Sequence, residues 1–366
     1  MFFDRVDKGF SKSMFDQEQE IELNKQFAKT MAKVRASLKT GTCYCCGKPI
    51  TSYCNSHSIP RYCLENIGTN GEVSSPNAIY GLPRMGQVIG KETPGINESG
   101  VFYLICRECD STVFKEYEDP THYTPGAEPT QVMLAQIAMK NYLKFIYKRK
   151  IEIELMESTL GRDHVHPLVI KEFSAKLEVS KIDLDTYSDS FALAKKYMET
   201  GKGPGYFLFY YRLLDYVAPI AIQVPLVVSI DLEGNVVNDL YNPDPDYKLS
   251  DLHVCVFPQK ATTAIMLFTD AGEKRYRKFR KQFSKLSDTE KLGVINYIIF
   301  LYSEDYYMAR EIQDKIDLQS LNRVANITPV IWSTTQYRDT RQVANTFSLA
   351  NWKCIPNLLS EEYKLR

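Results

Sequence analysis

Four cysteines, arranged as two pairs, are the residues of this sequence whose spacing points most directly to chemistry. Cys43 and Cys46 are separated by two residues, and the same spacing separates Cys106 from Cys109. Two thiolates at this spacing turn inward on one tight turn, and two such pairs supply the tetrahedral sulfur ligands of a structural zinc ion. We therefore predict that these four side chains together bind one structural zinc ion.

Three other cysteines, Cys45, Cys54 and Cys63, lie near these pairs. Adjacent residues rarely face the same ion, which counts against Cys45, and Cys54 has no partner two or three residues away. We interpret all three as small hydrophobic side chains. The chain has nine cysteines, an odd number, and no export signal, so metal ligands are favoured over disulfides for the paired residues.

A histidine lies between the two pairs, in the run Cys54-Asn-Ser-His57-Ser-Ile-Pro60. A C-x-x-C turn, a histidine followed within three residues by proline, and a second C-x-x-C pair followed by a polar residue resemble the HNH (ββα-metal) nuclease superfamily over about residues 43–119. The stretch also looks like a group of uncharacterised bacterial proteins described as HNH-like. The resemblance implies a treble-clef module with a second, helix-mounted cysteine pair.

The resemblance implies roles for two residues. His57 matches the general base that deprotonates water, and Asp110 occupies the position of the final metal-binding histidine. A Mg²⁺ or Mn²⁺ ion held there would stabilise the scissile phosphate and the leaving oxygen, and an aspartate oxygen suits such hard cations. His57 also has a structural alternative, in which it braces the module by donating to a backbone carbonyl.

Two features of the stretch depart from the family pattern. Ser56 stands where the family usually has an aspartate or a histidine, which leaves Asp110 as a single carboxylate. Other residues would have to help it bind a cation: Asn55, Glu116 or Glu118. The middle asparagine of the family has two matches, Asn77 and Asn97.

Basic residues in and after the module indicate where nucleic acid would bind. Lys140, Lys144 and Lys148 are spaced four residues apart, so they share one face of a predicted helix that would contact backbone phosphates. Arg61, just after the His57 motif, is a further candidate. The alternative is that the three lysines only form a solvated helix face. A denser basic stretch at 274–285 has aromatic residues at helical spacing, which favours a core-facing stripe.

Hydrophobic periodicity predicts the elements that position these residues. Helical patterns lie within 1–40 and at 129–156, 177–200, 271–286, 288–302, 304–317 and 341–349, and strand patterns lie at 206–216, 221–230, 236–240, 252–257 and 262–268. We predict an α+β fold, with a small treble-clef or ββα zinc module and a larger domain of helices and antiparallel sheet. The predicted units are an N-terminal helix (1–40), the zinc module (41–120), a helical connector (121–200) and a C-terminal α+β domain (201–366).

The balance of charge sets broad limits on function. The 366 residues have a formal net charge of zero, which argues against wholesale capture by DNA or membrane but permits a local basic patch. The N-terminus has no signal-peptide pattern, and no apolar run is long enough to span a membrane. We therefore expect a cytoplasmic protein without a membrane partner, in which the region 206–268 is available as a homo-oligomer interface.

Two functional hypotheses follow from these features. The first is an HNH-like, metal-dependent nuclease or nickase acting on nucleic acid, with DNA as the expected substrate and phage defence as the expected setting by analogy of architecture. The second is a non-catalytic, zinc-stapled module that binds nucleic acid or another protein. Ser56 favours the second hypothesis, and Asp110 favours the first.

Overall fold

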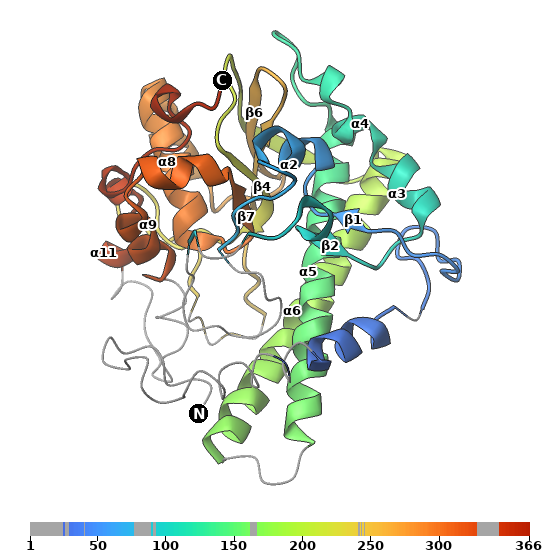
Figure 1. The fold of residues 1–366 in the computed structure, drawn as a ribbon. Coiled ribbons are helices and arrows are strands. Elements are labelled where there is room, and N and C mark those ends of the chain that lie inside the picture. The colour runs from blue at the N-terminus through green and yellow to red at the C-terminus, as the bar shows by residue number, and fades with distance from the viewer. Residues whose placement is uncertain are drawn as a thin grey trace.

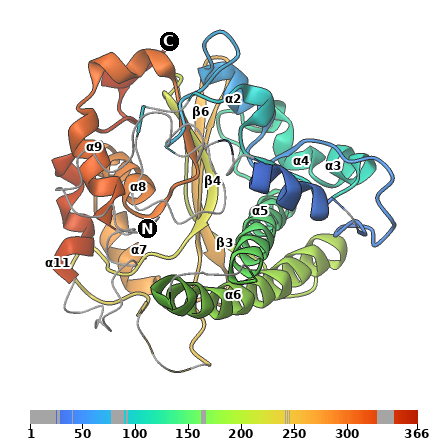
Figure 2. The same cartoon turned by 60° about the horizontal axis from the view of Figure 1, so that its bottom comes forward.

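A five-stranded antiparallel sheet lies at the centre of the computed structural model, between two groups of helices (Figures 1 and 2). The structure describes residues 25, 29–39, 41–76, 89–90, 93–161, 167–240, 242, 244, 246–327 and 344–366. The strands are β3 (Tyr206–Leu214), β4 (Ile220–Leu226), β5 (Leu252–Pro258), β6 (Thr263–Asp270) and β7 (Tyr306–Met308), in the spatial order β3-β6-β5-β4-β7. This mixed architecture confirms the predicted fold class.

The central strands β4 and β5 are buried along their whole length because both faces of the sheet are covered, and their residues are apolar except for Gln223 and His253. Every residue of β4 and β5 is buried, as expected for strands that read as short continuous apolar runs. The β5–β6 hairpin closes where the Gln259 amide donates to the Thr262 carbonyl over 2.8 Å. The strands predicted at 206–216, 221–230, 252–257 and 262–268 are confirmed as β3, β4, β5 and β6.

Two predicted elements are wrong. The segment 236–240 is not a strand and has one isolated bridge, between Ile230 and Val236. The Asn238 side chain fixes this backbone instead, since it donates to the carbonyls of Val228 (2.8 Å) and Ser250 (3.2 Å). The helix predicted at 304–317 is replaced by β7 and a 3-10 helix, η3 (Arg310–Lys315). The edge of β4 provides hydrogen-bonding groups for β7, which local sequence does not reveal.

Two long helices form a hairpin on one side of the molecule (Figure 1). They are α5 (Gln131–Leu160) and α6 (Pro167–Thr200). The helices on the other side of the sheet are α7 (Arg277–Ser284), α8 (Asp288–Tyr302), α9 (Leu318–Ala325) and α11 (Ala344–Phe347), with the 3-10 helices η5 (Leu349–Cys354) and η6 (Glu361–Tyr363) following. The aromatic stripe of the basic stretch faces the core as expected, because Tyr276, Phe279 and Phe283 are buried.

The cysteine-rich segment packs against α5 and the sheet. It contains β1 (Ser56–His57), α2 (Arg61–Ile67), η1 (Ile96–Glu98), β2 (Val101–Phe102), α3 (Arg107–Val113), α4 (Lys115–Glu118) and η2 (Pro120–His122). Side chains of this segment, including Leu64 and Phe102, belong to one hydrophobic cluster with Ile146 of α5 and Phe257 of β5. The module therefore packs on α5 and on the sheet through this shared cluster. Among the helices of the described residues, none combines the length and apolar character required to cross a membrane.

Candidate metal centre and active site

The four paired cysteines converge on one point. Their sulfur atoms all lie within 4.8 Å of one another, and the Cys46 and Cys106 Sγ atoms are 3.9 Å apart. Sulfurs bound to one zinc ion at about 2.3 Å in a tetrahedron lie about 3.8 Å apart. The donor set and its spacing therefore fit a metal ion that takes four thiolates, as the sequence predicted.

Local backbone geometry explains why these sulfurs meet. Gly47 adopts φ of 70°, a left-handed conformation, and its amide donates to the Cys43 carbonyl over 2.8 Å, which closes a tight turn. The second pair lies at the start of α3, where Cys106 is the N-cap residue and its amide donates to the Cys43 Sγ over 3.3 Å. This hydrogen bond connects the Cys43 turn to the start of α3.

Hydrogen bonds favour the thiolate form of Cys43, whereas burial raises the pKa of Cys109. A hydrogen bond from the neighbouring Cys45 thiol, followed by backbone amides that include Cys106, lowers the pKa of Cys43 to about 3 although burial opposes this shift. Thiolate is the form of cysteine that binds metals. The same contact raises the pKa of Cys45, so Cys45 remains a thiol that donates to a ligand. Cys45, Cys54 and Cys63 all lie outside the four-sulfur group, in agreement with their predicted role as small side chains.

The β1–β2 hairpin and helix α3 connect the four-cysteine cluster to a second set of residues, which lines a pocket. β1 pairs antiparallel with β2, with His57 opposite Val101, and α3 follows after Cys106. A pocket of about 280 Å³ opens beside this unit. Its lining is polar or charged throughout: Asn55, His57, Arg61, Asn97, Asp110, Glu118 and Lys140. The structure therefore brings His57 and Asp110, the two predicted catalytic residues, to the same pocket. Asn77 lies outside the described residues.

His57 presents one nitrogen to a fixed partner. Its Nε2 lies 3.1 Å from the Ile96 carbonyl oxygen, and a carbonyl only accepts, so Nε2 has the proton when the ring is neutral. The Nδ1 atom is then the basic nitrogen. Burial lowers the pKa of His57, so the ring is neutral at pH 7. This geometry satisfies the bracing role expected of His57 as an alternative, and it also leaves a lone pair for proton transfer.

A buried lysine links the two carboxylates of the pocket. Lys140 is 1% exposed, and its Nζ lies 2.8 Å from Asp110 Oδ1 and 3.1 Å from Glu118 Oε1. Ser56 Oγ donates to the same Asp110 oxygen over 2.5 Å. The Lys140 ammonium also lies 4.1 Å from the centre of the Phe114 ring, so an aromatic face completes its surroundings.

The buried ammonium of Lys140 and the carboxylates it contacts stabilise one another. Burial alone would lower the pKa of Lys140, but the carboxylates of Glu118 and Asp110 raise it above its usual range. Burial alone would raise the pKa of Asp110, but the charge of Lys140 and the hydrogen bonds from Lys140 and Ser56 hold it below its usual range. Lys140 and Asp110 are therefore both charged at neutral pH.

This arrangement does not fit a divalent cation at Asp110. Mg²⁺ and Mn²⁺ bind carboxylate oxygens that are free to coordinate, whereas Asp110 Oδ1 and Glu118 Oε1 both contact the Lys140 ammonium. An ion at these oxygens would have to displace that ammonium or lie beside its positive charge. At these two carboxylates the structure places the ammonium of a buried lysine.

The other predicted phosphate contacts have different environments. Lys144 is 2% exposed, and Lys148 pairs with Glu304 and Asp305. The row formed with Lys140 is therefore not a solvent-exposed basic face, because α5 is enclosed by the rest of the protein on this side. Arg61 is more than half exposed at the pocket rim and pairs with Glu65 over 2.8 Å, so it remains a candidate for contacting phosphate.

Sequence reasoning missed the role of Lys140 and gave Glu118 only as an alternative helper. Lys140 and Asp110 are 30 residues apart on different helices, and no spacing rule connects them. Comparison of the chain with protein-family models, with curated proteins and with solved structures finds no match in any of the three. A function is therefore inferred from the fold and from the geometry of the pocket.

Proposed function

We propose that this protein is an HNH-like nuclease that hydrolyses phosphodiester bonds in nucleic acid, with DNA as the expected substrate. The observation behind the proposal is the pocket that brings His57, a neutral ring with Nδ1 as its basic nitrogen, together with the exposed guanidinium of Arg61. A neutral histidine and a fixed positive charge are what a phosphodiester needs for attack by water. His57 lies on β1 and Arg61 at the start of α2, between the two cysteine pairs in the sequence.

The residues of the pocket have separate tasks in this proposal. His57 Nδ1 takes a proton from water as the water oxygen bonds to phosphorus, and the leaving oxygen separates and takes a proton from solvent. Arg61, more than half exposed at the rim, attracts the backbone and supplies the positive charge that offsets the charge developing on the phosphate oxygens. Lys140, Asp110 and Glu118 hold this wall of the pocket in place through their ion pairs.

Zinc is the ion that the four cysteines best suit. Four thiolates match a closed structural site, which contributes to folding without taking part in chemistry. In this proposal zinc holds the turn at Cys43 against the start of α3, and so keeps Asp110, the residue after Cys109, facing His57.

A second candidate function is a binding module without catalysis. Ser56 Oγ occupies one oxygen of Asp110, and His57 Nε2 contacts the Ile96 carbonyl, so each predicted catalytic residue also has a structural partner. A module of this kind would bind nucleic acid or protein and cut neither. In the first candidate His57 is needed for cleavage, whereas in the second it contributes only to folding.

Replacement of His57 by glutamine is expected to lower the cleavage rate by about 10²–10⁴-fold, the usual contribution of a general base. Glutamine keeps a donor for the Ile96 carbonyl but provides no basic nitrogen. The measurement compares the rates at which the purified parent and variant cleave supercoiled plasmid and RNA. In the parent, activity should fall only as the pH drops below the usual histidine pKa of about 6.5, because burial lowers the pKa of His57 and the ring stays neutral above it. Equal cleavage by the two proteins would exclude His57 as the base, and retained binding without cleavage by either would favour the second candidate.

Cleavage is expected to proceed at the same rate with and without added Mg²⁺ or Mn²⁺. The reason is that the Lys140 ammonium already occupies the carboxylates that would bind the ion. The measurement is the initial cleavage rate in buffer stripped of free divalent ions, with the zinc content of the protein determined in parallel. An absolute requirement for Mg²⁺ would contradict the proposed role of Lys140 and restore the metal-dependent mechanism.

A further inference from the structure

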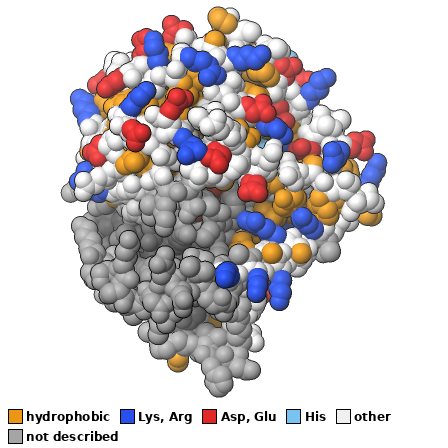
Figure 3. Space-filling model, in the orientation of Figure 1, with side chains coloured by type: hydrophobic (Ala, Val, Ile, Leu, Met, Phe, Trp, Pro, Cys, Tyr) orange, Lys and Arg blue, Asp and Glu red, His pale blue; other side chains and the backbone are white. Residues whose placement is uncertain are grey.

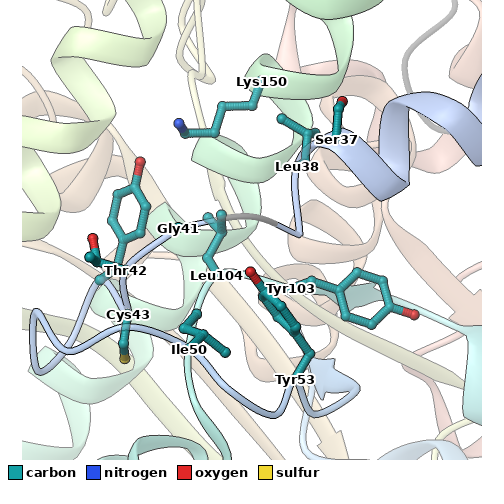
Figure 4. Close-up of a pocket in the computed structure, with 11 residues that line it drawn as sticks. Ser37, Leu38, Gly41, Thr42, Cys43, Ile50, Tyr53, Tyr103, Leu104 and Lys150 are labelled. Atoms are coloured by element: carbon teal, nitrogen blue, oxygen red, sulfur yellow. The ribbon is translucent and has the colours of Figure 1, made fainter.

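A second pocket adjoins the four-cysteine cluster and has a different character. It has a volume of about 460 Å³ and lies between the helical segment at 29–37, the Cys43 turn and α5 (Figure 4). Three tyrosines line it, Tyr44, Tyr53 and Tyr103, together with Ile50 and Lys150. Figure 4 shows Lys150 reaching in from α5, with Ile50 and Tyr53 on the opposite side.

The charges at this pocket all have the same sign. The Lys150 Nζ lies 5.7 Å from the centre of the Tyr44 ring, and the Lys39 Nζ lies 4.4 Å from the centre of the Tyr103 ring. No aspartate or glutamate lines the pocket among the described residues. The adjoining residues 29–39 include four basic side chains and no acidic one: Lys29, Lys33, Arg35 and Lys39. Figure 3 shows lysine and arginine side chains gathered on this part of the surface.

We propose that this pocket binds a nucleotide, with its base against the tyrosines and its phosphate on Lys150. Tyrosine faces stack on bases of any sequence, and a nearby ammonium group binds the phosphate. The volume is within the range of about 300–1,000 Å³ typical of small-ligand sites. A cationic ligand is disfavoured because two ammonium groups already lie against the rings and, in the part of the chain that the structure describes, no carboxylate lines the pocket.

The inference deepens the proposed function and rests on it for the source of the nucleotide. Cys43 borders this pocket, and Cys109 directly precedes Asp110 of the His57 pocket, so both pockets adjoin the same cysteine cluster. A nucleic acid strand held at the tyrosines would therefore have neighbouring phosphates within the same module. Nucleotide binding and cleavage are measured separately, which keeps failure of one distinct from failure of the other.

Fluorescence anisotropy with labelled single-stranded dT8 and rU8 tests the proposal, with the His57→Gln protein used so that no probe is cut. Lys150→Gln is expected to weaken binding about tenfold and to make the salt dependence shallower by about 0.7, the value for one lost phosphate contact on a single strand. Tyr53→Leu is expected to weaken binding about tenfold through loss of one stacked base, whereas Tyr53→Phe retains the parent affinity. Lys278→Gln makes the same charge change on α7, across the sheet, and should leave binding unchanged.

Competition with AMP and with inorganic phosphate identifies what is bound. Competition by AMP, with phosphate ineffective, supports a site for a free nucleotide, and competition by unlabelled oligonucleotide alone supports a site for a nucleic acid strand. Parent affinity in both Lys150→Gln and Tyr53→Leu, equal competition by AMP and phosphate, or no binding of any probe would each overturn the proposal. If the parent protein cleaves no nucleic acid while binding still depends on Lys150 and Tyr53, the nuclease proposal fails and this site remains. Thermal unfolding of each variant confirms that the fold is retained.

Discussion

Replacement of Lys140 by methionine is expected to lower the free energy of unfolding by about 3–5 kcal/mol, the usual cost of removing one partner from a buried ion pair. Lys140 is 1% exposed, and its loss leaves Asp110 and Glu118 facing each other without a positive charge. Methionine retains most of the volume of the lysine side chain, so the measured loss reflects charge more than a cavity. Urea denaturation at pH 7 measures it, and the cleavage rate should fall with it.

Two controls separate the role of charge from that of packing. The triple variant Lys140→Met, Asp110→Asn, Glu118→Gln removes all three charges together and should recover much of the lost stability, since no ion remains unpaired. Added Mn²⁺ should raise the melting temperature of Lys140→Met but not that of the parent, because its two carboxylates are free to bind a hard cation. A Lys140→Met protein as stable as the parent would contradict the ion network, and stabilisation of the parent by Mn²⁺ would contradict the assignment of Lys140 to the place of the ion.

Replacement of Cys106 by serine is expected to abolish zinc binding and to destabilise the module by several kcal/mol, because the binding free energy of a structural zinc ion is also folding free energy. Cys106 contacts both Cys46 and Cys43 through its sulfur and its amide, so its loss removes a ligand and loosens the turn. Elemental analysis of freshly purified protein should show near-stoichiometric zinc in the parent and only background in the variant. Cleavage should be lost as well, since Asp110 is positioned by the same helix start.

The matched control for this experiment is Cys354→Ser. Cys354 is exposed in η5, on the opposite side of the sheet, and is not part of the four-sulfur group. The control should keep full zinc content, stability and cleavage. Absence of zinc from the fresh parent protein would overturn the assignment of the ion, and full zinc content in Cys106→Ser would show that the four cysteines do not act as one ligand set.

Elements held by local interactions could be predicted from the sequence. The helix at 288–302 is found with those bounds because it begins at a capping box, in which the side chain of Ser287 and that of Glu290 each bond the other's backbone amide. The β5–β6 hairpin and the cysteine cluster follow the same logic, since each depends on a tight turn within a few residues. Placement of His57 beside Asp110 was predicted from a resemblance and from the flanking cysteines.

Features that depend on which segments pack against an element could not be predicted from the sequence. Helix α5 is buried continuously from Met133 to Lys144, and a helix covered on all sides has no polar face from which its orientation could be inferred. The lysine row therefore looked like an exposed basic surface. In the structure the module covers Lys140, and segment 304–305 meets Lys148.

The sequence by itself determined which four cysteines form the candidate metal site, because C-x-x-C spacing constrains the two sulfurs of each pair through the local backbone alone. It also determined the fold class and the residues available for chemistry in the module. Only the tertiary structure decided that the cation beside Asp110 is the ammonium of Lys140, and that three tyrosines and Lys150 enclose one pocket. These groups come from segments far apart in the chain, and the packing of α5 against the module and the sheet brings them together.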